Sequence, residues 1–375
     1  MTAQIRAAGA PGEIRLAVTD DAGLRDYALW RPAHPDGVGD IHRGRAGARL
    51  PALGGTFIDL ADGLSGFLPD SAAPGPLAEG DPVLVRVTRA AQGGKGARLA
   101  ACSPGDLPPG GAPPALAGPP VLLARGPTPL AALAASWPDA PILVADAAIA
   151  ARLPPALRPR LHRVARAFDS ETEAAVAALA EPSVDLPGGM RATITPTPAL
   201  VAIDMDGGAA STDRRAKQTA QFAANRDALP ALLHQIRLRN LSGAIVLDVA
   251  GLAIRKRQAL RDTIEGALAR DPLRPRFLGF TALGLAEILR PRVGPPLHEL
   301  LSGATGRALR MLDEWARQAA GRHGTAPALR VGTDLARALE ANPDAMDDAA
   351  RLSGHQLAWR LDPSLPPLGW SHDRD

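Results

Sequence analysis

The chain has few cysteines, few aromatic residues and almost no lysine. Cys102 is the single cysteine among 375 residues, which excludes an internal disulfide and a cysteine-only zinc site within one chain. Aromatic residues make up 3% of the sequence and hydrophobic residues 46%, so the interior must consist mainly of Ala, Val, Leu and Ile. Only Lys95, Lys217 and Lys256 are lysines among 42 basic residues, a bias that makes any single arginine weak evidence of function.

Long apolar runs are also missing. No stretch reaches the roughly 18 apolar residues that a membrane-spanning helix needs, and the N-terminal sequence has no basic, apolar segment of signal-peptide type. We therefore expect a soluble, cytoplasmic protein that does not have a membrane as partner.

Length and patterning predict several domains. A chain of 375 residues exceeds what one core usually organises. Residues 13–30 are expected to form a hairpin, and short strands between glycine turns in 39–103 are typical of a small barrel. Two α/β units are expected further along. Their predicted strands lie at 120–124, 142–144, 200–205, 244–249 and 277–280, and their predicted helices at 130–137, 171–180, 225–237 and 255–269.

Two aspartates end stretches that read as buried strands. Asp204 follows the apolar run Leu200–Ile203, and Asp248 follows Ala244–Leu247. Burying a carboxylate without a partner is costly, so an acid at such a position needs something to neutralise it. A divalent cation held between two strand ends is one such partner. For each aspartate alone, a capping or turn-forming role is the alternative.

Positive charge is concentrated around these aspartates. Residues 204–292 contain 15 Lys and Arg against 9 Asp and Glu, whereas the whole chain has a formal net charge of +3. The rest of the chain is therefore slightly negative. Positive potential around an acidic pair suits a polyanion that brings its own phosphates to a metal.

Three blocks of sequence around the aspartates carry a family resemblance. They are Ala199–Asp206, Gln235–Asp248 and Gly284–Arg292, and Asp248 lies 44 residues after Asp204. Together they resemble the catalytic domain of the ribonuclease E/G family. Four segments resemble the S1-type OB-fold barrel of that family, and Val331–Trp370 resembles its small C-terminal α/β domain. The four barrel segments are Ile41–Arg45, Phe57–Asp59, Gly66–Pro69 and Gly94–Gly96.

The resemblance implies a multidomain α/β fold in which an S1-type OB-fold β-barrel interrupts an RNase H-like domain. The implied domains are 1–38, the first part of the RNase H-like domain; 39–103, the S1-type OB-fold RNA-binding domain; 104–119, a Pro/Gly linker; 120–190, the second part of the RNase H-like domain; 191–300, a DNase I-like α/β catalytic domain; and 301–375, a helical connection with a small C-terminal α/β domain.

The resemblance also implies a chemistry. In the family, the aspartates that match Asp204 and Asp248 hold a magnesium ion that activates water against a phosphodiester of single-stranded RNA, leaving 5′-phosphate products. Asp206 belongs to the same catalytic strand end. RNA contacts are predicted at two aromatic and five basic residues: Phe57, Phe67, Lys95, Arg237, Arg239, Arg290 and Arg292.

The chain departs from the family pattern in four ways. Asp206 stands where the family usually has asparagine, whose amide can donate to phosphate, and it could instead serve as a third metal contact. Thr195 and Pro198 stand where glutamates are common. The zinc-link cysteines are missing, so a homodimer would form without a zinc link. Only 104–119 stands where the family inserts a segment that recognises the RNA 5′-monophosphate, which predicts cleavage insensitive to the 5′ end.

Each RNA-binding prediction has a structural alternative. Phe57 and Phe67 could fill the barrel core, Lys95 could be a solvated loop charge, and the arginines could be helix-surface charges. The run Arg255-Lys256-Arg257 is interpreted as a solvated helix face. For the protein as a whole, the alternatives to a metal-dependent endoribonuclease are an RNA-binding relative with little or no cleavage activity and a generic α/β protein with fortuitous motifs.

Overall fold

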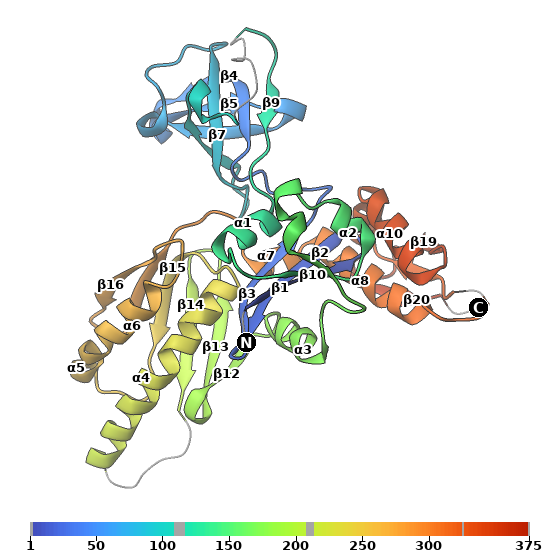
Figure 1. Ribbon diagram of the computed structural model, residues 1–375. Coiled ribbons are helices and arrows are strands. Elements are labelled where there is room, and N and C mark those ends of the chain that lie inside the picture. The colour runs from blue at the N-terminus through green and yellow to red at the C-terminus, as the bar shows by residue number, and fades with distance from the viewer. Residues whose placement is uncertain (1–2, 109–116, 208–213, 325, 374–375) are drawn as a thin grey trace. The chain divides into compact units, whose positions relative to one another are not determined.

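The computed structural model describes residues 3–108, 117–207, 214–324 and 326–373. Two compact units are present, one formed by 1–34, 129–291 and 296–375 and the other by 35–128 and 292–295 (Figure 1). The larger unit is therefore built from stretches on both sides of the smaller one. Residues 109–116 of the expected linker lie outside the described residues.

The first sheet of the larger unit combines strands from before and after the smaller unit. Its order is β11-β10-β1-β2-β3, with β1, β2 and β3 antiparallel and β10 and β11 parallel to β1. The predicted hairpin is confirmed as β2 and β3. The strands are β1 (Gln4–Ala10), β2 (Glu13–Asp20), β3 (Gly23–Trp30), β10 (Ile142–Val144) and β11 (Leu161–Arg163), and the associated helices are α1 (Pro129–Ser136), α2 (Ala147–Ala151) and α3 (Ser170–Ala178).

The smaller unit is a β-barrel. Its sheet order is β5-β6-β8-β7-β4-β9, and pairing of β5 with β4 closes five of the strands, which is compatible with an OB-fold. Val121–Ala124, expected to start the second part of the α/β domain, is instead β9, an edge strand on β4. The strands are β4 (Ile41–Leu50), β5 (Gly55–Asp59), β6 (Ser65–Pro69), β7 (Pro82–Arg89), β8 (Ala97–Ala101) and β9 (Val121–Ala124).

A second, six-stranded sheet of the larger unit carries the two aspartates. Its order is β12-β13-β14-β15-β17-β16, in which only β14 and β15 are parallel neighbours. No strand is predicted from the sequence at β12, β13 or β17. The strands are β12 (Ser183–Leu186), β13 (Met190–Pro196), β14 (Val201–Asp206), β15 (Gly243–Asp248), β16 (Arg276–Phe280) and β17 (Ala286–Arg290).

Alternation along β14 and β15 gives this sheet two different faces. Val201, Ile203 and Met205 of β14 are buried in one hydrophobic core with Ile245 and Leu247 of β15. That core also contains residues of α4 (Arg214–Leu238) and α6 (Arg261–Leu268), which lie across one side of the sheet in Figure 1. The residues between them point to the opposite side, since successive side chains of a strand alternate. We call this side the acidic face; it carries Asp204, Asp206, Asp248 and Glu287.

The C-terminal part of the larger unit combines helices with a small sheet. Its three strands have the order β19-β18-β20, and a core centred on Trp315 joins them to the helices. The helices are α7 (Leu297–Ser302), α8 (Ala304–Ala319), α9 (Thr333–Glu340) and α10 (Pro343–Ser353), and the strands are β18 (Leu329–Val331), β19 (Trp359–Leu361) and β20 (Trp370–His372). One further short helix, α5 (Ile254–Arg257), follows β15.

A buried ion pair fastens the end of β17. Arg290 lies in β17 on the core side with Ile288, and its Nε donates to Asp271 Oδ2 at 2.7 Å. Its Nη1 donates to Asn240 Oδ1 at 2.8 Å and to the Leu241 carbonyl at 3.1 Å. The side chains of Arg290 and Asp271 are only 4% and 8% exposed.

Replacing Arg290 should destabilise the protein strongly. Arg290→Gln leaves the Asp271 carboxylate buried without its counter-charge, and we expect the free energy of unfolding to fall by about 3 kcal/mol. The matched control is Arg317→Gln, since Arg317 is 68% exposed and pairs with Asp313 within one helix; its expected cost is below about 1 kcal/mol. Urea denaturation compares the two, and equal small losses would contradict the structural role of Arg290.

The pair Asp362–Arg330 makes the C-terminal sheet sensitive to acid. Hydrogen bonds from Ser364, then from Arg330, lower the pKa of Asp362 to about 2. Because this carboxyl binds its proton less readily in the folded state, its stabilising contribution is complete above the unfolded pKa of about 3.9. It is lost as the pH falls through about 2. Asp362→Asn should therefore lower the melting temperature at pH 7, and its effect should shrink as the pH falls through about 2. An effect as large at pH 2 as at pH 7 would refute this assignment.

Candidate functional site

The sheet register brings the two predicted aspartates together. Asp204 and Asp248 are direct partners across the parallel pair β14–β15, and both belong to the acidic face. Their neighbours Ile203 and Leu247 are buried on the other side of the sheet, so the alternation fixes the direction of both carboxylates. Asp204 is exposed, and the Asp248 side chain is 48% exposed. Both acids can therefore reach a bound ion or substrate.

A third carboxylate adds to the negative charge at this point. Asp206 lies two residues after Asp204 in β14, points the same way and is exposed. Partial burial, followed by the charges of Asp206 and Asp248, raises the pKa of the Asp204 carboxyl above its ordinary value. The shift has the direction expected for like charges gathered in one place. A cation at this position would relieve that repulsion.

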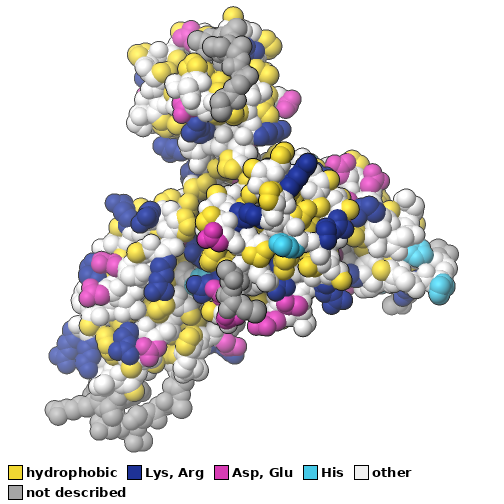
Figure 2. All heavy atoms as spheres, in the orientation of Figure 1, with side chains coloured by type: hydrophobic (Ala, Val, Ile, Leu, Met, Phe, Trp, Pro, Cys, Tyr) yellow, Lys and Arg dark blue, Asp and Glu magenta, His cyan; other side chains and the backbone are white. Residues whose placement is uncertain are grey.

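Arg257 supplies a positive charge on one side of the acidic group. Its Nη1 donates to Asp248 Oδ1 at 2.6 Å and to the Gly284 carbonyl at 2.8 Å, and its Nε donates to the Leu252 carbonyl at 2.9 Å. The Arg257 side chain is 11% exposed. The interpretation of Arg255-Lys256-Arg257 as a solvated helix face is therefore wrong for its third member. Figure 2 shows basic side chains gathered near α5, where this run lies.

Two polar residues of α4 hold the segment that follows Asp248. Asn225 is fully buried; its side-chain amide donates to the Ala250 carbonyl at 2.9 Å, and its Oδ1 accepts from the Ala250 N–H at 3.0 Å. Gln218 donates to the Gly251 carbonyl at 2.9 Å and accepts from the Ala253 N–H at 3.2 Å. These contacts fix the path of the chain from β15 into α5, and so they also place Arg257.

The donor chemistry of Asp204 and Asp248 fits a hard divalent cation. Both donors are carboxylate oxygens, which magnesium prefers, and magnesium usually takes one or two carboxylates and keeps several waters. Within the described residues, no group of three or more His, Cys, Asp or Glu could hold a metal ion. Asp204 and Asp248 alone would leave the other coordination positions of such an ion to water.

Three of the arginines predicted to contact RNA are instead used inside the protein. Arg290 is buried in its ion pair with Asp271. Arg239 is 6% exposed and donates to the carbonyls of Glu181 and, at 3.1 Å, Ala178. Arg237 Nη2 donates to the carbonyl of Arg25 and lies 3.5 Å from Asp26 Oδ1. These two contacts join the end of α4 to the first sheet. Their guanidinium groups are occupied by structural partners, so the RNA-binding prediction is corrected for these three residues.

The remaining RNA-binding predictions fall in the smaller unit. Phe57 and Phe67 are register partners on β5 and β6, with ring centroids 5.6 Å apart and an edge-to-face angle of 66°. Phe57 is 37% exposed, so this pair lies on the outer side of the barrel and does not fill its core. Lys95 is exposed in the turn that precedes β8. The positions predicted for Phe57, Phe67 and Lys95 are all accessible to a ligand.

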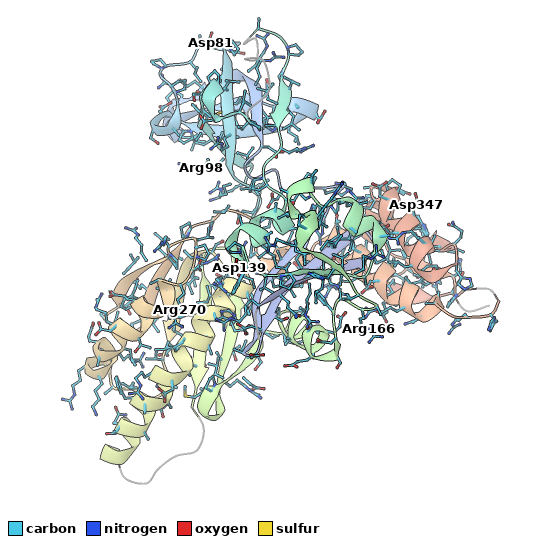
Figure 3. All side chains as sticks on the ribbon, viewed as in Figure 1. Asp81, Arg98, Asp139, Arg166, Arg270 and Asp347 are labelled. Atoms are coloured by element: carbon cyan, nitrogen blue, oxygen red, sulfur yellow. The ribbon has the colours of Figure 1, made fainter. Side chains whose placement is uncertain are left out.

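An exposed arginine lies beside the aromatic pair on the barrel. Arg98 is the register partner of Phe67 and is exposed, and Figure 3 shows its side chain pointing away from the barrel. Burial, followed by the charges of Arg98 and Arg292, lowers the pKa of Arg89. Arg292 belongs to the smaller unit with the barrel. Aromatic rings and guanidinium groups thus share one surface.

The positions that depart from the family pattern are exposed. Thr195 lies on the same side of the sheet as Asp204, where its register partner is Ala202, and Pro198 lies in the turn between β13 and β14. Thr193 is the register partner of Asp204 itself.

Cys102 is a free cysteine at the end of β8. Among the helices that the structure describes, none has the length and apolar character needed to cross a membrane.

Comparison with known proteins gives a consistent family assignment. Residues 151–293 match the model of the Ribonuclease E/G family, a range that contains β14, β15 and Arg257. The chain is 34% identical over 148 residues to Ribonuclease E of Nostoc sp., covering 38% of this chain and 21% of that protein. It is 33% identical over 135 residues to Ribonuclease G of Escherichia coli, covering 36% of this chain and 27% of that protein.

These matches cover only part of each protein. The chain spans between 21% and 27% of the length of these two relatives. The matched range nevertheless includes the strands that carry all three acids of the site. The family match and the relatives together support membership of this chain in the ribonuclease E/G family.

Proposed function

We propose that this protein is a magnesium-dependent endoribonuclease that cleaves single-stranded RNA during RNA processing or decay in the cytoplasm. The observation that carries the proposal is the register of β14 and β15, which sets Asp204 directly opposite Asp248 on one face of the sheet. The family match and the names of the relatives support the same activity class.

The proposed reaction is hydrolysis of a phosphodiester. A water oxygen attacks phosphorus, the bond from phosphorus to the 3′ oxygen breaks, and the leaving oxygen takes up a proton, so the downstream product carries a 5′-phosphate. Magnesium would make the water more acidic and offset charge on the phosphate oxygens. Asp204 and Asp248 would hold it through one or more carboxylate oxygens. Asp206 is an acceptor when ionised, so it would orient water and not the phosphate itself.

The smaller unit would bind the RNA strand. Base stacking on exposed aromatic side chains stabilises binding by about 1–3 kcal/mol per base and tolerates any sequence. Phe57 and Phe67 offer such rings, and Arg98 and Lys95 offer positive charge for the backbone. This combination supports the assignment of an S1-type OB-fold domain.

The finer domain assignment is part of the proposal as well. Assembly of one sheet from residues 4–30 and 142–163, with the barrel inserted between them, supports an interrupted RNase H-like domain. The sheet of β12–β17 would then be the DNase I-like catalytic domain. A homodimer without a zinc link stays a prediction.

Cleavage should depend on Asp204 and on magnesium. The purified protein, incubated with labelled single-stranded RNA and Mg²⁺, should produce internal cuts that EDTA abolishes. Asp204→Asn should lower the cleavage rate at least a hundredfold, on the order of what loss of a metal ligand or its close support costs. The control is Asp227→Asn, an exposed acid on α4 that pairs with Arg226 and should leave the rate unchanged. RNA binding without any cuts would instead favour the RNA-binding relative. A protein that neither binds nor cuts the RNA would refute both readings.

Cleavage should not depend on the 5′ end of the RNA. The sequence offers only 104–119 where a 5′-monophosphate-binding segment would be inserted. One oligonucleotide with either a 5′-monophosphate or a 5′-hydroxyl should therefore be cut at rates within about twofold, since one phosphate far from the reacting bond adds little unless a pocket binds it. A strong preference for the monophosphate would show that another part of the chain recognises it.

A further inference from the structure

Arg257 is largely buried against Asp248, whereas Arg255 of the same helix is exposed. Arg255, two residues earlier in α5, is exposed, whereas Arg257 is 11% exposed and makes a 2.6 Å contact with Asp248 Oδ1. The same guanidinium also binds the carbonyls of Leu252 and Gly284. One side chain therefore connects Asp248, the segment after β15 and the turn between β16 and β17.

The local structure is built around this guanidinium. Gly284 has a φ of +85°, and a Cβ atom on it would lie 3.1 Å from Arg257 Cδ and 3.1 Å from Ile254 Cγ1. A larger residue would therefore be strained and would press on Arg257. From the other side, Asn225 holds Ala250 through two hydrogen bonds, so the start of α5 has a fixed position. The contact with Asp248 is thus set by several neighbours.

The geometry leaves one oxygen of Asp248 outside this contact. Arg257 binds Oδ1, and the side chain of Asp248 is still 48% exposed. A carboxylate that is fixed through one oxygen presents the other in a defined direction. A positive charge held this close also repels a second cation, and such repulsion weakens only slowly with distance when the groups are partly buried.

We propose that Arg257 is a positioning residue that orients Asp248 for the metal and, through its own charge, keeps the metal affinity of the site low. The inference rests on the proposed metal-dependent function and deepens it. Loss of the charge should strengthen metal binding more than loss of orientation weakens it, because β14 pairs with Asp248 itself and β17 with the residue before it, so only one short side chain becomes free. Loss of orientation should appear in the rate of cleavage.

Two substitutions separate charge from geometry. Arg257→Gln removes both, so Mn²⁺ should bind about threefold to tenfold more tightly, as expected for removal of one nearby like charge. Arg257→Lys keeps the charge but not the planar fork that reaches three acceptors, so its Mn²⁺ affinity should stay near that of the unsubstituted protein. In both variants the single-turnover cleavage rate at saturating Mn²⁺ should fall about tenfold or more, since the ligand is no longer held in place.

The experiment uses the full chain and counts free Mn²⁺ by electron paramagnetic resonance. Arg255→Gln is the matched control, because it removes the same charge from the same helix and should leave affinity and rate unchanged. Thermal unfolding checks that each variant is folded. A purely structural role for Arg257 would lower stability without strengthening metal binding.

The possible outcomes are distinct. Mn²⁺ binding by Arg257→Gln that is equal to or weaker than that of the unsubstituted protein would overturn the proposal, as would wild-type cleavage rates in both variants. If Arg257→Gln does not fold, a wild-type rate for Arg257→Lys overturns it alone. If Asp248→Asn binds Mn²⁺ as tightly as the unsubstituted protein does, the proposed metal site is refuted. The proposed function then fails independently of Arg257.

Discussion

The pairing of β14 with β15 is the constraint on which the proposed chemistry depends. Asp204 and Asp248 are far apart in sequence, and they meet because two parallel strands place them at the same level of one sheet. A shift of this register by one residue would turn Asp248 into the core, since side chains alternate along a strand. Val201, Ile203, Ile245 and Leu247 prevent such a shift, because they would then leave the core formed with α4 and α6.

The electrostatics of the site follow from the same arrangement. Three carboxylates on neighbouring positions repel one another, and the raised pKa of Asp204 reflects this together with partial burial. The protein places the Arg257 guanidinium beside the group, where it binds Oδ1 of Asp248. A cation could still enter where the acids face each other. The site thus combines fixed carboxylates with incomplete neutralisation, a combination that would favour reversible over permanent binding of a hydrated ion.

Continuous apolar runs predicted β14 and β15, because both strands are largely buried in one core. The register of these strands then sets the two predicted acids, Asp204 and Asp248, opposite each other. The arginines were predicted poorly, because nothing in the order of residues distinguishes a guanidinium that faces solvent from one that binds carbonyls of a distant segment. Arg290 lies on the core side of β17, a strand that had not been recognised, and Arg239 binds carbonyls about 60 residues earlier in the chain. Arg257 likewise reaches Asp248 through a turn whose path depends on the buried Asn225.

The account depends on one ion being shared by two carboxylates of the acidic face. The most direct test is a crystal structure of the protein soaked in Mn²⁺, with the metal located by its anomalous scattering. The account predicts one strong peak bonded to an oxygen of Asp204 and an oxygen of Asp248, with water completing its coordination. A site occupied elsewhere in the protein, with the two aspartates free of metal at saturating Mn²⁺, would contradict it.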